Sequence, residues 1–461
     1  MSDELTSLSA ARAAELIRGG ELSPVELVGA YLRRIERLNP RLGAVLTLAP
    51  DVLKRARKAE AAPARGESVG PLHGVPLTVK DTIQVRGMRM TRGSRLDSES
   101  APSEDAAAVA RLRAAGAIII GKTNCSELAL DYTADNPADG RTNNPHDLSR
   151  SPGGSSGGCA AAVAACLTGA SLGSDLAGSV RIPAHFCGVA GLKPTAGRLP
   201  GHGHTPPVSG PYALGASLGP LARTVEDLEL MFGVLAGDSA PRFEAESLRG
   251  ARAALYFDDG AVPANEEVRS AVARAAEALK GAGLLVVEER PPSIESAHAA
   301  WLETFSYPTA CFLREFYRGR EDEAGPTARA ILKREAPTPT AEQLLASWRK
   351  RDRLREELLL WMERTPLLVA PVGPVEAFRH EDSRKVEVGG ETFPVFRAFG
   401  LAQAFNVYDL PAVCVPAGLT RAGLPVGVQI AGRPNEERRV LAAARVVEGA
   451  LGGWRPPPMF A

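Results

Sequence analysis

The sequence predicts an α/β fold in which short apolar strands alternate with helices. Two observations indicate it. Runs such as GVPLTVK and AIII have the length of buried strands, and helical segments with one apolar face lie between such runs. In sheets built this way, functional residues gather beyond the C-terminal ends of the strands.

The first elements are helices. Ser23 is expected as the N-cap of a helix that has Pro24 at its first position, and Glu26 is placed to close a capping box. Pro40 is expected to stop this helix. A second, more polar helix is expected over residues 51–62.

The following segments alternate in type. GVPLTVK is a buried strand with Lys80 at its C-terminal end, and SEDAAAVARLRAAG is a helix that ends at Gly116. The strand AIII follows, and later AAAVAACL forms a helix so rich in alanine that its neighbours must pack closely. ASLGSD is expected as a strand that leads into a turn and then a helix starting near VRIPAHF.

The composition shifts near Ala236. ARAALYFDD and GLLVVEER flank a strong helix and predict a strand–helix–strand unit. Residues 300–365 are charged and mainly helical, and they are interpreted as a solvated layer rather than a binding surface. Strands return at PLLVAPV and LPVGVQIAG, and the helix EERRVLAAARVVEGAL closes the chain.

Composition excludes several classes of function. The 461 residues are 44% hydrophobic, enough for a large core, and 54 Lys and Arg balance 54 Asp and Glu. A net charge of zero gives no basic field for nucleic acid. No run has the length of a membrane span, and the N-terminus lacks the apolar centre of a signal peptide.

The six cysteines show neither a CxxC pair nor a Cys/His cluster, so no zinc site is expected. They are interpreted as buried free thiols of a reducing compartment. The sequence therefore predicts a cytoplasmic protein.

The loop SPGGSSGG admits several chemistries. A P-loop requires a lysine after its last glycine, where this chain has Cys159, although a glycine–serine–serine turn also occurs in one superfamily of small-molecule kinases. The seven histidines include none in an evident triad, no G-x-S-x-G elbow is present, and His185 is interpreted as a packing residue.

A serine with a lysine base is the third arrangement. Burying Lys80 at the end of an apolar strand would lower its pKa toward the range of a general base. Residue type alone favours a simpler interpretation, in which Lys80 pairs with Asp81. Ser179 lies on a small-residue turn that suits either an oxyanion hole or an ordinary N-cap.

Taken together, these segments resemble the amidase signature family. The matching segments run in the family's order between about residues 70 and 433, most specifically between 150 and 198: GVPLTVKD, GKTN, SPGGSSGGCAAAVAA, GSDLAGSVRIPAHFCGVAGLKPTAGR, GPLARTVEDLEL and LPVGVQIAGRP. The resemblance implies the family's fold, a large mixed central β-sheet covered by helices on both faces. It implies a single domain over residues 1–461, with N-terminal helices at 1–65, a catalytic core at about 66–235 and 400–461, and a peripheral variable region at about 236–399.

The resemblance also implies a Ser-cisSer-Lys triad. Ser179 would be the nucleophile, Ser155 would follow a cis peptide bond and relay the proton, and Lys80 would be the base. An oxyanion hole would come from backbone N–H groups of Leu176, Ala177 and Gly178. Ser156, Asp175 and Arg181 would support the site, and neither a metal nor an organic cofactor is implied.

One residue departs from the family's pattern. Ala177 stands where many members have a first glycine before the nucleophile. If residue 177 needed a positive φ, alanine would be strained there. We expect instead that only Gly178 needs such geometry.

The expected function is hydrolysis of a small carboxylic amide to acid plus ammonia or amine through an acyl-serine. The alternatives are the amidase subunit of a tRNA-dependent glutamyl/aspartyl amidotransferase, a catalytically inactive binding protein on the same fold, and a phosphate-binding enzyme. Neither nucleic acid nor a membrane is expected as a partner, and a homodimer stays open.

Overall fold

One mixed sheet runs through the molecule. The computed structural model describes residues 2–67, 69–96, 98–238, 242–334 and 338–460. The strands of the sheet are Val45–Leu48 (β1), Pro76–Lys80 (β2), Ile118–Thr123 (β3), Ala170–Asp175 (β6), Ala190–Lys193 (β7), Ser217–Ala222 (β8), Arg252–Leu255 (β9), Leu285–Glu288 (β10), Leu367–Pro371 (β11), Ala412–Leu419 (β14) and Pro425–Gly432 (β15). Their spatial order is β1-β3-β2-β6-β8-β7-β14-β15-β11-β9-β10, which gives an 11-stranded sheet.

The sheet is parallel only in part. β2 lies parallel to both β3 and β6, and β9 lies parallel to both β10 and β11. The strands between these two groups pair antiparallel. Two short hairpins stand apart from the sheet, Asp135–Asn136 (β4) with Gly140–Arg141 (β5) and Lys385–Val388 (β12) with Glu391–Pro394 (β13). The expected α/β fold with a mixed central sheet is confirmed.

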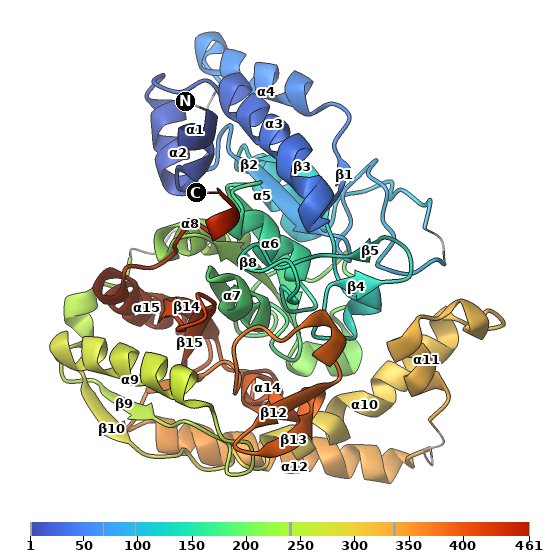
Figure 1. Cartoon of the computed structure of the whole chain (residues 1–461), viewed down its shortest axis with the longest axis vertical. Helices are drawn as coiled ribbons and strands as arrows, with labels where there is room; N and C mark the ends of the chain where they lie inside the picture. The colour runs from blue at the N-terminus through green and yellow to red at the C-terminus, as the bar shows by residue number, and fades with distance from the viewer. Residues whose placement is uncertain (1, 68, 97, 239–241, 335–337, 461) are drawn as a thin grey trace.

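Helices flank the sheet. They span Ser2–Ser7 (α1), Ala10–Arg18 (α2), Pro24–Leu42 (α3), Val52–Ala61 (α4), Ala107–Ala114 (α5), Gly157–Ala164 (α6), Arg181–Cys187 (α7), Val225–Ala236 (α8), Glu266–Gly281 (α9), Ala297–Phe316 (α10), Pro326–Leu332 (α11), Ala341–Met362 (α12), Val395–Ala398 (α13), Gly400–Val407 (α14) and Glu437–Leu451 (α15). Figure 1 shows α1–α4 at one end of the molecule and α9, β10 and α12 at the other. None of the described helices combines the length and apolar character that crossing a membrane requires.

Helix α3 begins as expected and ends later than expected. The Ser23 hydroxyl accepts hydrogen bonds from the N–H groups of Val25 (3.1 Å) and Glu26 (3.2 Å), which confirms the N-cap. The reciprocal bond of a capping box, from Ser23 N–H to the Glu26 carboxylate, is absent from the described structure, and the Ser23 hydroxyl donates to the Glu60 carboxylate.

Pro40 does not stop the helix, so that prediction is wrong. Proline removes one backbone donor, yet the helix continues past it to Leu42. Gly43 ends it in the left-handed conformation (φ 64°), and the Asn39 side chain accepts from the N–H groups of Ala44 and Val45. The side chain at 39 and the glycine at 43 decide where the helix ends.

The alanine-rich helix α6 lies in the interior. Every residue of α6 is buried, which confirms the expectation that its neighbours pack closely. A Cβ atom on Gly158 would lie 2.5 Å from the backbone N and O of Asn124, so only glycine allows this approach. Helix α6 packs on β6 and α7, and it sets the distance between the glycine–serine loop before it and the turn before α7.

The middle of the chain divides into an outer and an inner part. The expected strand–helix–strand unit is confirmed as β9–α9–β10. Helix α12 buries only Arg351, Leu358 and Met362 among its described side chains, as a solvated layer would. Helix α10 differs, because Trp301, Thr304 and Phe305 are buried in the core. The interpretation of residues 300–365 as a solvated layer is therefore wrong for α10.

Candidate active site

Lys80 is a buried amine surrounded by hydroxyl groups. It ends β2, which lies between the parallel strands β3 and β6, and its exposed fraction is 0%. Its Nζ donates to Ser155 Oγ at 2.6 Å and to Ser174 Oγ at 3.0 Å. Asp81 pairs with Lys122 instead (Nζ–Oδ1 3.1 Å), so the simpler interpretation of a Lys80–Asp81 pair is wrong.

The pKa of Lys80 is lowered. Burial removes water from the ammonium form and is the main cause, while the negative charge of Asp175 acts in the opposite direction. Neither hydroxyl that contacts Nζ carries a charge to stabilise an ammonium. The site therefore favours the neutral amine, which can accept a proton.

The loop before α6 places Ser155 on this amine. The peptide bond between Gly154 and Ser155 is cis, as the resemblance implies. Gly153 has φ 79°, a conformation that favours glycine. A Cβ atom on Gly154 would collide with the backbone N and O of Thr133, so the loop packs against its neighbour without room for a side chain.

Ser156 connects the loop to the turn that carries Ser179. Its backbone N–H donates to the carbonyl of Ser179 at 3.1 Å, and its hydroxyl donates to the carbonyl of Ser174 at 3.2 Å. The loop and the turn, which α6 and β6 separate in sequence, are thereby held together. Ser155 and Ser179 line the same pocket.

The turn from Asp175 to Arg181 joins β6 to α7. Gly178 has φ 103°, and a Cβ atom there would lie 2.7 Å from Ala402 Cβ and 2.8 Å from Ile182 Cδ1. Ala177 is absent from the described residues with a positive φ, as we expected. Alanine is thus unstrained at 177, and only 178 requires glycine.

Asp175 organises the turn through its carboxylate. It accepts from the N–H groups of Gly178 (2.8 Å) and Val180 (3.0 Å) and forms a buried pair with Arg181 (3.0 Å). Burial opposes its ionisation, but the Arg181 guanidinium and these donors hold its pKa below the ordinary value. Asp175 is therefore a buried carboxylate whose oxygens are already occupied.

Arg181 extends this network to the C-terminal part of the chain. Its guanidinium donates to Gln429 Oε1 (2.9 Å) and Asn406 Oδ1 (2.7 Å), and Asn406 Nδ2 donates to Asp175 Oδ1 (2.9 Å). No local motif in the sequence marked Asn406, and nothing within the matching segment LPVGVQIAGRP singled out Gln429. They lie 225 and 248 residues from Arg181, so only the tertiary structure brings them to the site.

Ser174 contacts the Lys80 amine, and it was not identified from the sequence. Ser174 lies on β6, five positions before Ser179 in the sequence. Side chains alternate between the two faces of a strand, so Ser174 faces the same way as Leu172 and the opposite way from Asp175. This alternation was the one signal available in the sequence. That signal alone does not identify a partner for Lys80. The contact at 3.0 Å follows from the parallel pairing of β2 with β6.

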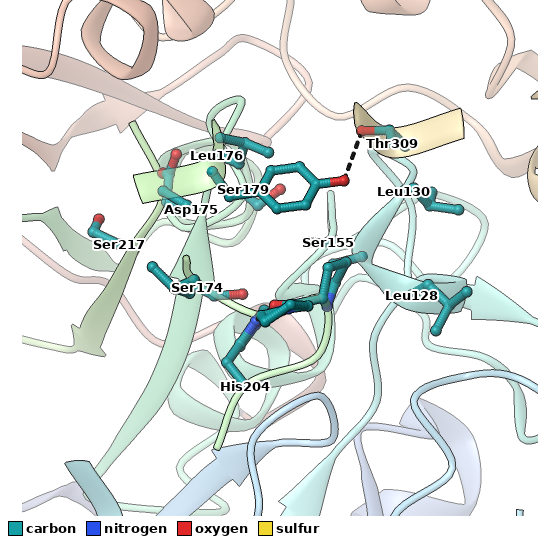
Figure 2. Close-up of a pocket in the computed structure, with 16 residues that line it drawn as sticks. Leu128, Leu130, Ser155, Ser174, Asp175, Leu176, Ser179, His204, Ser217 and Thr309 are labelled. Carbon is teal, nitrogen blue, oxygen red and sulfur yellow. Dashed lines mark hydrogen bonds between the residues drawn. The ribbon is translucent and has the colours of Figure 1, made fainter. Parts of the chain in front are cut away.

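A small, mostly apolar pocket opens onto these serines. Its free volume is about 60 Å³. Figure 2 shows Leu128 and Leu130 on the opposite side of Ser155 from Ser174 and Ser179. The Tyr212 hydroxyl donates to Thr309 Oγ1 at 3.1 Å across the rim. The lining residues are Leu128, Ala129, Leu130, Ser155, Ser174, Asp175, Leu176, Ser179, His204, Pro206, Pro207, Val208, Tyr212, Ala216, Ser217 and Thr309.

His204 is the histidine that lies in this pocket, and sequence reasoning did not single it out. Its Nδ1 lies 2.6 Å from the carbonyl of Pro206, which can only accept, so Nδ1 carries the proton. Nε2 therefore accepts from the Thr82 hydroxyl (3.0 Å). Burial lowers the pKa of His204 to about 3, so the ring is neutral and its lone pair is occupied.

Neither His185 nor a cluster of metal-ligating side chains belongs to this site in the described part of the chain. His185 is fully buried, accepts from Gly427 N–H at 2.8 Å and contacts the Val375 carbonyl, which fits its expected packing role. No group of three or more His, Cys, Asp or Glu side chains in the described part of the chain could hold a metal ion.

Comparison with known proteins agrees with this geometry. The model of the family described as Amidase matches residues 26–441. The chain is 34% identical to a glutamyl-tRNA(Gln) amidotransferase subunit of Roseiflexus castenholzii, over 95% of this chain and 94% of that protein. It is 34% identical to the corresponding subunit of Moorella thermoacetica, over 99% of both chains.

Solved structures show the same fold. A crystal structure of an amidase superposes with a TM-score of 0.87 at 32% identity, covering 96% of this chain and 100% of that chain. A 6-aminohexanoate cyclic dimer hydrolase complexed with substrate gives a TM-score of 0.86 at 30% identity, covering 99% and 100%. With the family match over most of the chain and the fold reproduced throughout, the chain belongs to the amidase family and is an amide-hydrolysing enzyme.

Proposed function

We propose that Lys80, Ser155 and Ser179 form the catalytic triad of this amidase. The observation that carries the proposal is the 2.6 Å contact between the buried Lys80 amine and Ser155 Oγ, at a pocket that Ser179 also lines. A lysine without an acidic partner, next to one serine and at a pocket lined by a second serine, has the parts of a proton relay.

In the first half-reaction, neutral Lys80 accepts a proton from Ser155 while Ser155 accepts one from Ser179. The Ser179 oxygen attacks the amide carbon, and a tetrahedral oxyanion forms. The proton then returns from Lys80 through Ser155 to the amide nitrogen, the C–N bond breaks, and ammonia or an amine leaves. Protonation of the nitrogen is essential because an amide anion is a poor leaving group.

In the second half-reaction, water replaces the amine. The relay removes a proton from water, which attacks the acyl-Ser179 ester, and the proton returns to the Ser179 oxygen as the acid leaves. The two half-reactions use the same three side chains and restore them to their starting state.

Backbone N–H groups of the turn would stabilise the oxyanion. Gly178 N–H already donates to Asp175 Oδ1 at 2.8 Å, so it is committed to the turn. The N–H groups of Leu176 and Ala177 donate to no acceptor among the described residues. Of the three expected donors, we assign the oxyanion hole to Leu176 and Ala177, with Gly178 shaping the turn.

Ser156, Asp175 and Arg181 act as supports in this proposal. Ser156 joins the relay loop to Ser179 through backbone and hydroxyl bonds. Asp175 and Arg181 hold the turn through a buried ion pair that also takes up Gly178 N–H. None of these side chains is placed to transfer a proton, because their polar atoms already have partners.

The pocket favours a small uncharged amide as substrate. A free volume of about 60 Å³ is smaller than an engineered cavity of about 150 Å³ that binds benzene. Asp175 is the one charged residue in the lining, and Arg181 already neutralises it. Free glutamine would bring an ammonium and a carboxylate that need partners of opposite charge. This supports a stand-alone amidase over a glutamine-hydrolysing subunit of an amidotransferase, the kind of enzyme for which its relatives are named.

A panel of substrates tests both assignments. Acetamide, butyramide, hexanamide, benzamide and L-glutamine are compared by release of ammonia. We expect turnover of the short apolar amides and loss of that turnover in Ser179→Ala, whereas Ser171→Ala, a buried serine on the same strand that does not line the pocket, retains it. Turnover of glutamine alone, together with purification in a complex with other subunits, would instead establish the amidotransferase subunit.

A fluorophosphonate probe tests the nucleophile and the rival class. The probe is expected to modify Ser179, identified by mass spectrometry of the digested protein, in the folded wild-type chain and not after denaturation. An unlabelled Ser179 in folded protein would favour the catalytically inactive binding protein. Stabilisation of the chain by ATP with magnesium would favour the phosphate-binding enzyme.

Cysteine chemistry and charge bear on the compartment and the partners of the enzyme. All six cysteines are free, which supports a cytoplasmic enzyme, and equal numbers of acidic and basic residues support a small-molecule enzyme without a nucleic acid partner. Size-exclusion chromatography with light scattering separates the monomer from the homodimer and from a complex with other subunits.

A further inference from the structure

Each backbone carbonyl from Asp175 to Gly178, in the turn before Ser179, accepts a hydrogen bond from a residue outside that segment. Asp175 O accepts from Asn406 Nδ2 (3.2 Å), and Gly178 O accepts from Ile182 N (2.7 Å). The two carbonyls between them accept from aromatic side chains. Trp301 Nε1 donates to Leu176 O at 2.8 Å, and the Tyr132 hydroxyl donates to Ala177 O at 2.8 Å.

These two bonds set the direction of the N–H groups that follow. A peptide group is planar and trans, so a carbonyl and the next residue's N–H point in opposite directions. Trp301 therefore fixes the plane whose other end is Ala177 N–H, which donates to no described acceptor. Tyr132 fixes the plane whose other end is Gly178 N–H, which donates to Asp175.

The two donors belong to one rigid aromatic cluster, here named the aromatic clamp and made of Tyr132, Trp301 and Phe396. Phe396 stacks on Tyr132 (centroids 5.3 Å, interplanar angle 12°) and meets Trp301 edge-on (4.9 Å, 64°). All three rings are thereby fixed relative to one another. The clamp unites a loop before the glycine–serine segment, helix α10 and helix α13.

The direction of the Tyr132 bond is also determined. Gln403 Nε2 donates to the Phe396 carbonyl (2.7 Å) and to the Tyr132 oxygen (3.0 Å). Since the Phe396 carbonyl can only accept, the side-chain amide of Gln403 has one possible orientation. The Tyr132 oxygen therefore receives a bond from Gln403 and uses its own proton for Ala177 O.

We propose that Trp301 and Tyr132 are positioning residues of the oxyanion turn. Trp301 orients Ala177 N–H toward the reacting carbonyl oxygen and polarises it, because a donor on the carbonyl of a peptide strengthens the N–H at its other end. Tyr132 keeps Gly178 N–H on Asp175 and so holds the turn in shape. The inference rests on the proposed function of Ser179, and it places α10, from the middle of the chain, behind the turn that carries Ser179.

The test removes each donor and keeps an aromatic ring at each position. Trp301→Phe and Tyr132→Phe are compared with Trp348→Phe and Tyr256→Phe, whose Nε1 and hydroxyl have no hydrogen-bond partner in the described structure. The readouts are the rate at which the fluorophosphonate labels Ser179, and kcat and KM for the best short amide of the panel. We expect Trp301→Phe to lower the labelling rate and kcat by about 10- to 100-fold with KM nearly unchanged, and Tyr132→Phe to lower them less.

The outcomes separate the two proposals. If wild-type Ser179 is not labelled, the proposed function fails and this inference with it. If wild-type Ser179 is labelled and Trp301→Phe matches Trp348→Phe in rate, the function stands and the positioning role is overturned. A rise in KM at constant kcat would also overturn it, because that result indicates a role in substrate binding.

If the Trp301→Phe variant does not fold, a second replacement at the same position tests the role of the indole N–H. Benzothienylalanine at position 301 keeps the shape of the indole ring and replaces its N–H by sulfur. The same fall in kcat is expected in that folded variant. Unchanged kcat with benzothienylalanine would show that the ring matters only for packing, which would overturn the inference.

Discussion

Lys80 and Lys122 lie on neighbouring parallel strands, and both are fully buried, yet their surroundings differ in kind. Lys122 pairs with Asp81 (3.1 Å) and donates to the carbonyl of Ile83 (2.7 Å). Lys80 contacts the hydroxyls of Ser155 and Ser174. Asp81 gives Lys122 a countercharge, while the hydroxyls that contact Lys80 carry none. The partner, and not burial, decides which lysine is structural and which can be a base.

Replacing Lys80 gives the largest expected effect. Lys80→Met keeps an unbranched side chain that is one atom shorter and removes the proton acceptor, so kcat for the best amide should fall by about 10³- to 10⁴-fold. The fold should persist, because an apolar side chain is inserted where a neutral amine was buried. Steady-state kinetics with circular dichroism measures both. Activity within tenfold of wild type would exclude Lys80 as the base.

Replacing Lys122 should act on stability instead. Lys122→Met leaves the Asp81 carboxylate buried without its countercharge, and the loss of one partner of such a pair costs about 3–5 kcal/mol. Denaturant unfolding measures this cost. The double variant Lys122→Met/Asp81→Asn should recover part of it, since the remaining side chain is then neutral. A variant as stable as wild type but inactive would reverse the roles assigned to the two lysines.

The pH dependence sharpens the same comparison. The pKa of Lys80 is lowered by burial, so the neutral amine forms below the ordinary value of about 10.4. kcat/KM should rise with pH, about tenfold per unit below that pKa, and level off above it. The folded chain binds fewer protons here than the unfolded chain, so this group makes stability rise with pH from the lowered pKa up to the ordinary one.

The measurements are the rate of Ser179 labelling by the fluorophosphonate and kcat/KM for the amide, each as a function of pH. The free energy of unfolding is measured at the same pH values. Both rates should depend on pH through a single ionisation, that of Lys80. A rate that is flat across the neutral and alkaline range would contradict a lysine base.

Removing the Ser174 hydroxyl, the second hydroxyl that contacts Lys80, should have the smallest effect. Ser174→Ala deletes one of the two hydrogen bonds to Lys80 Nζ and leaves the 2.6 Å contact with Ser155. A net hydrogen bond contributes about 1 kcal/mol, so kcat should fall about fivefold to tenfold. Ser171→Ala is the control on the same strand. A loss as large as that of Lys80→Met would mean that Ser174, and not Ser155, passes the proton.

Much of the site could be predicted because its chemistry lies in short motifs. The strand ending in Lys80, the loop before α6 and the small-residue turn before Ser179 each have a local physical cause: an apolar run, glycines with restricted surroundings, and a strand-to-helix junction. Other features had no local cause. Trp301 lies 125 residues from Leu176, and Asn406 lies 225 residues from Arg181, so no window of the sequence contains both partners.

The sequence by itself determined the strands, most of the helices and the residue types that can perform amide hydrolysis. The tertiary structure decided which of those residues meet. Parallel pairing of β2 with β6 brings the Ser174 hydroxyl into hydrogen-bond contact with Lys80 Nζ. Helix α10 brings the Trp301 indole to the Leu176 carbonyl in the turn before Ser179. The physical reason is that secondary structure follows from neighbours along the chain, whereas a pKa and the direction of an N–H group depend on atoms that only packing brings together.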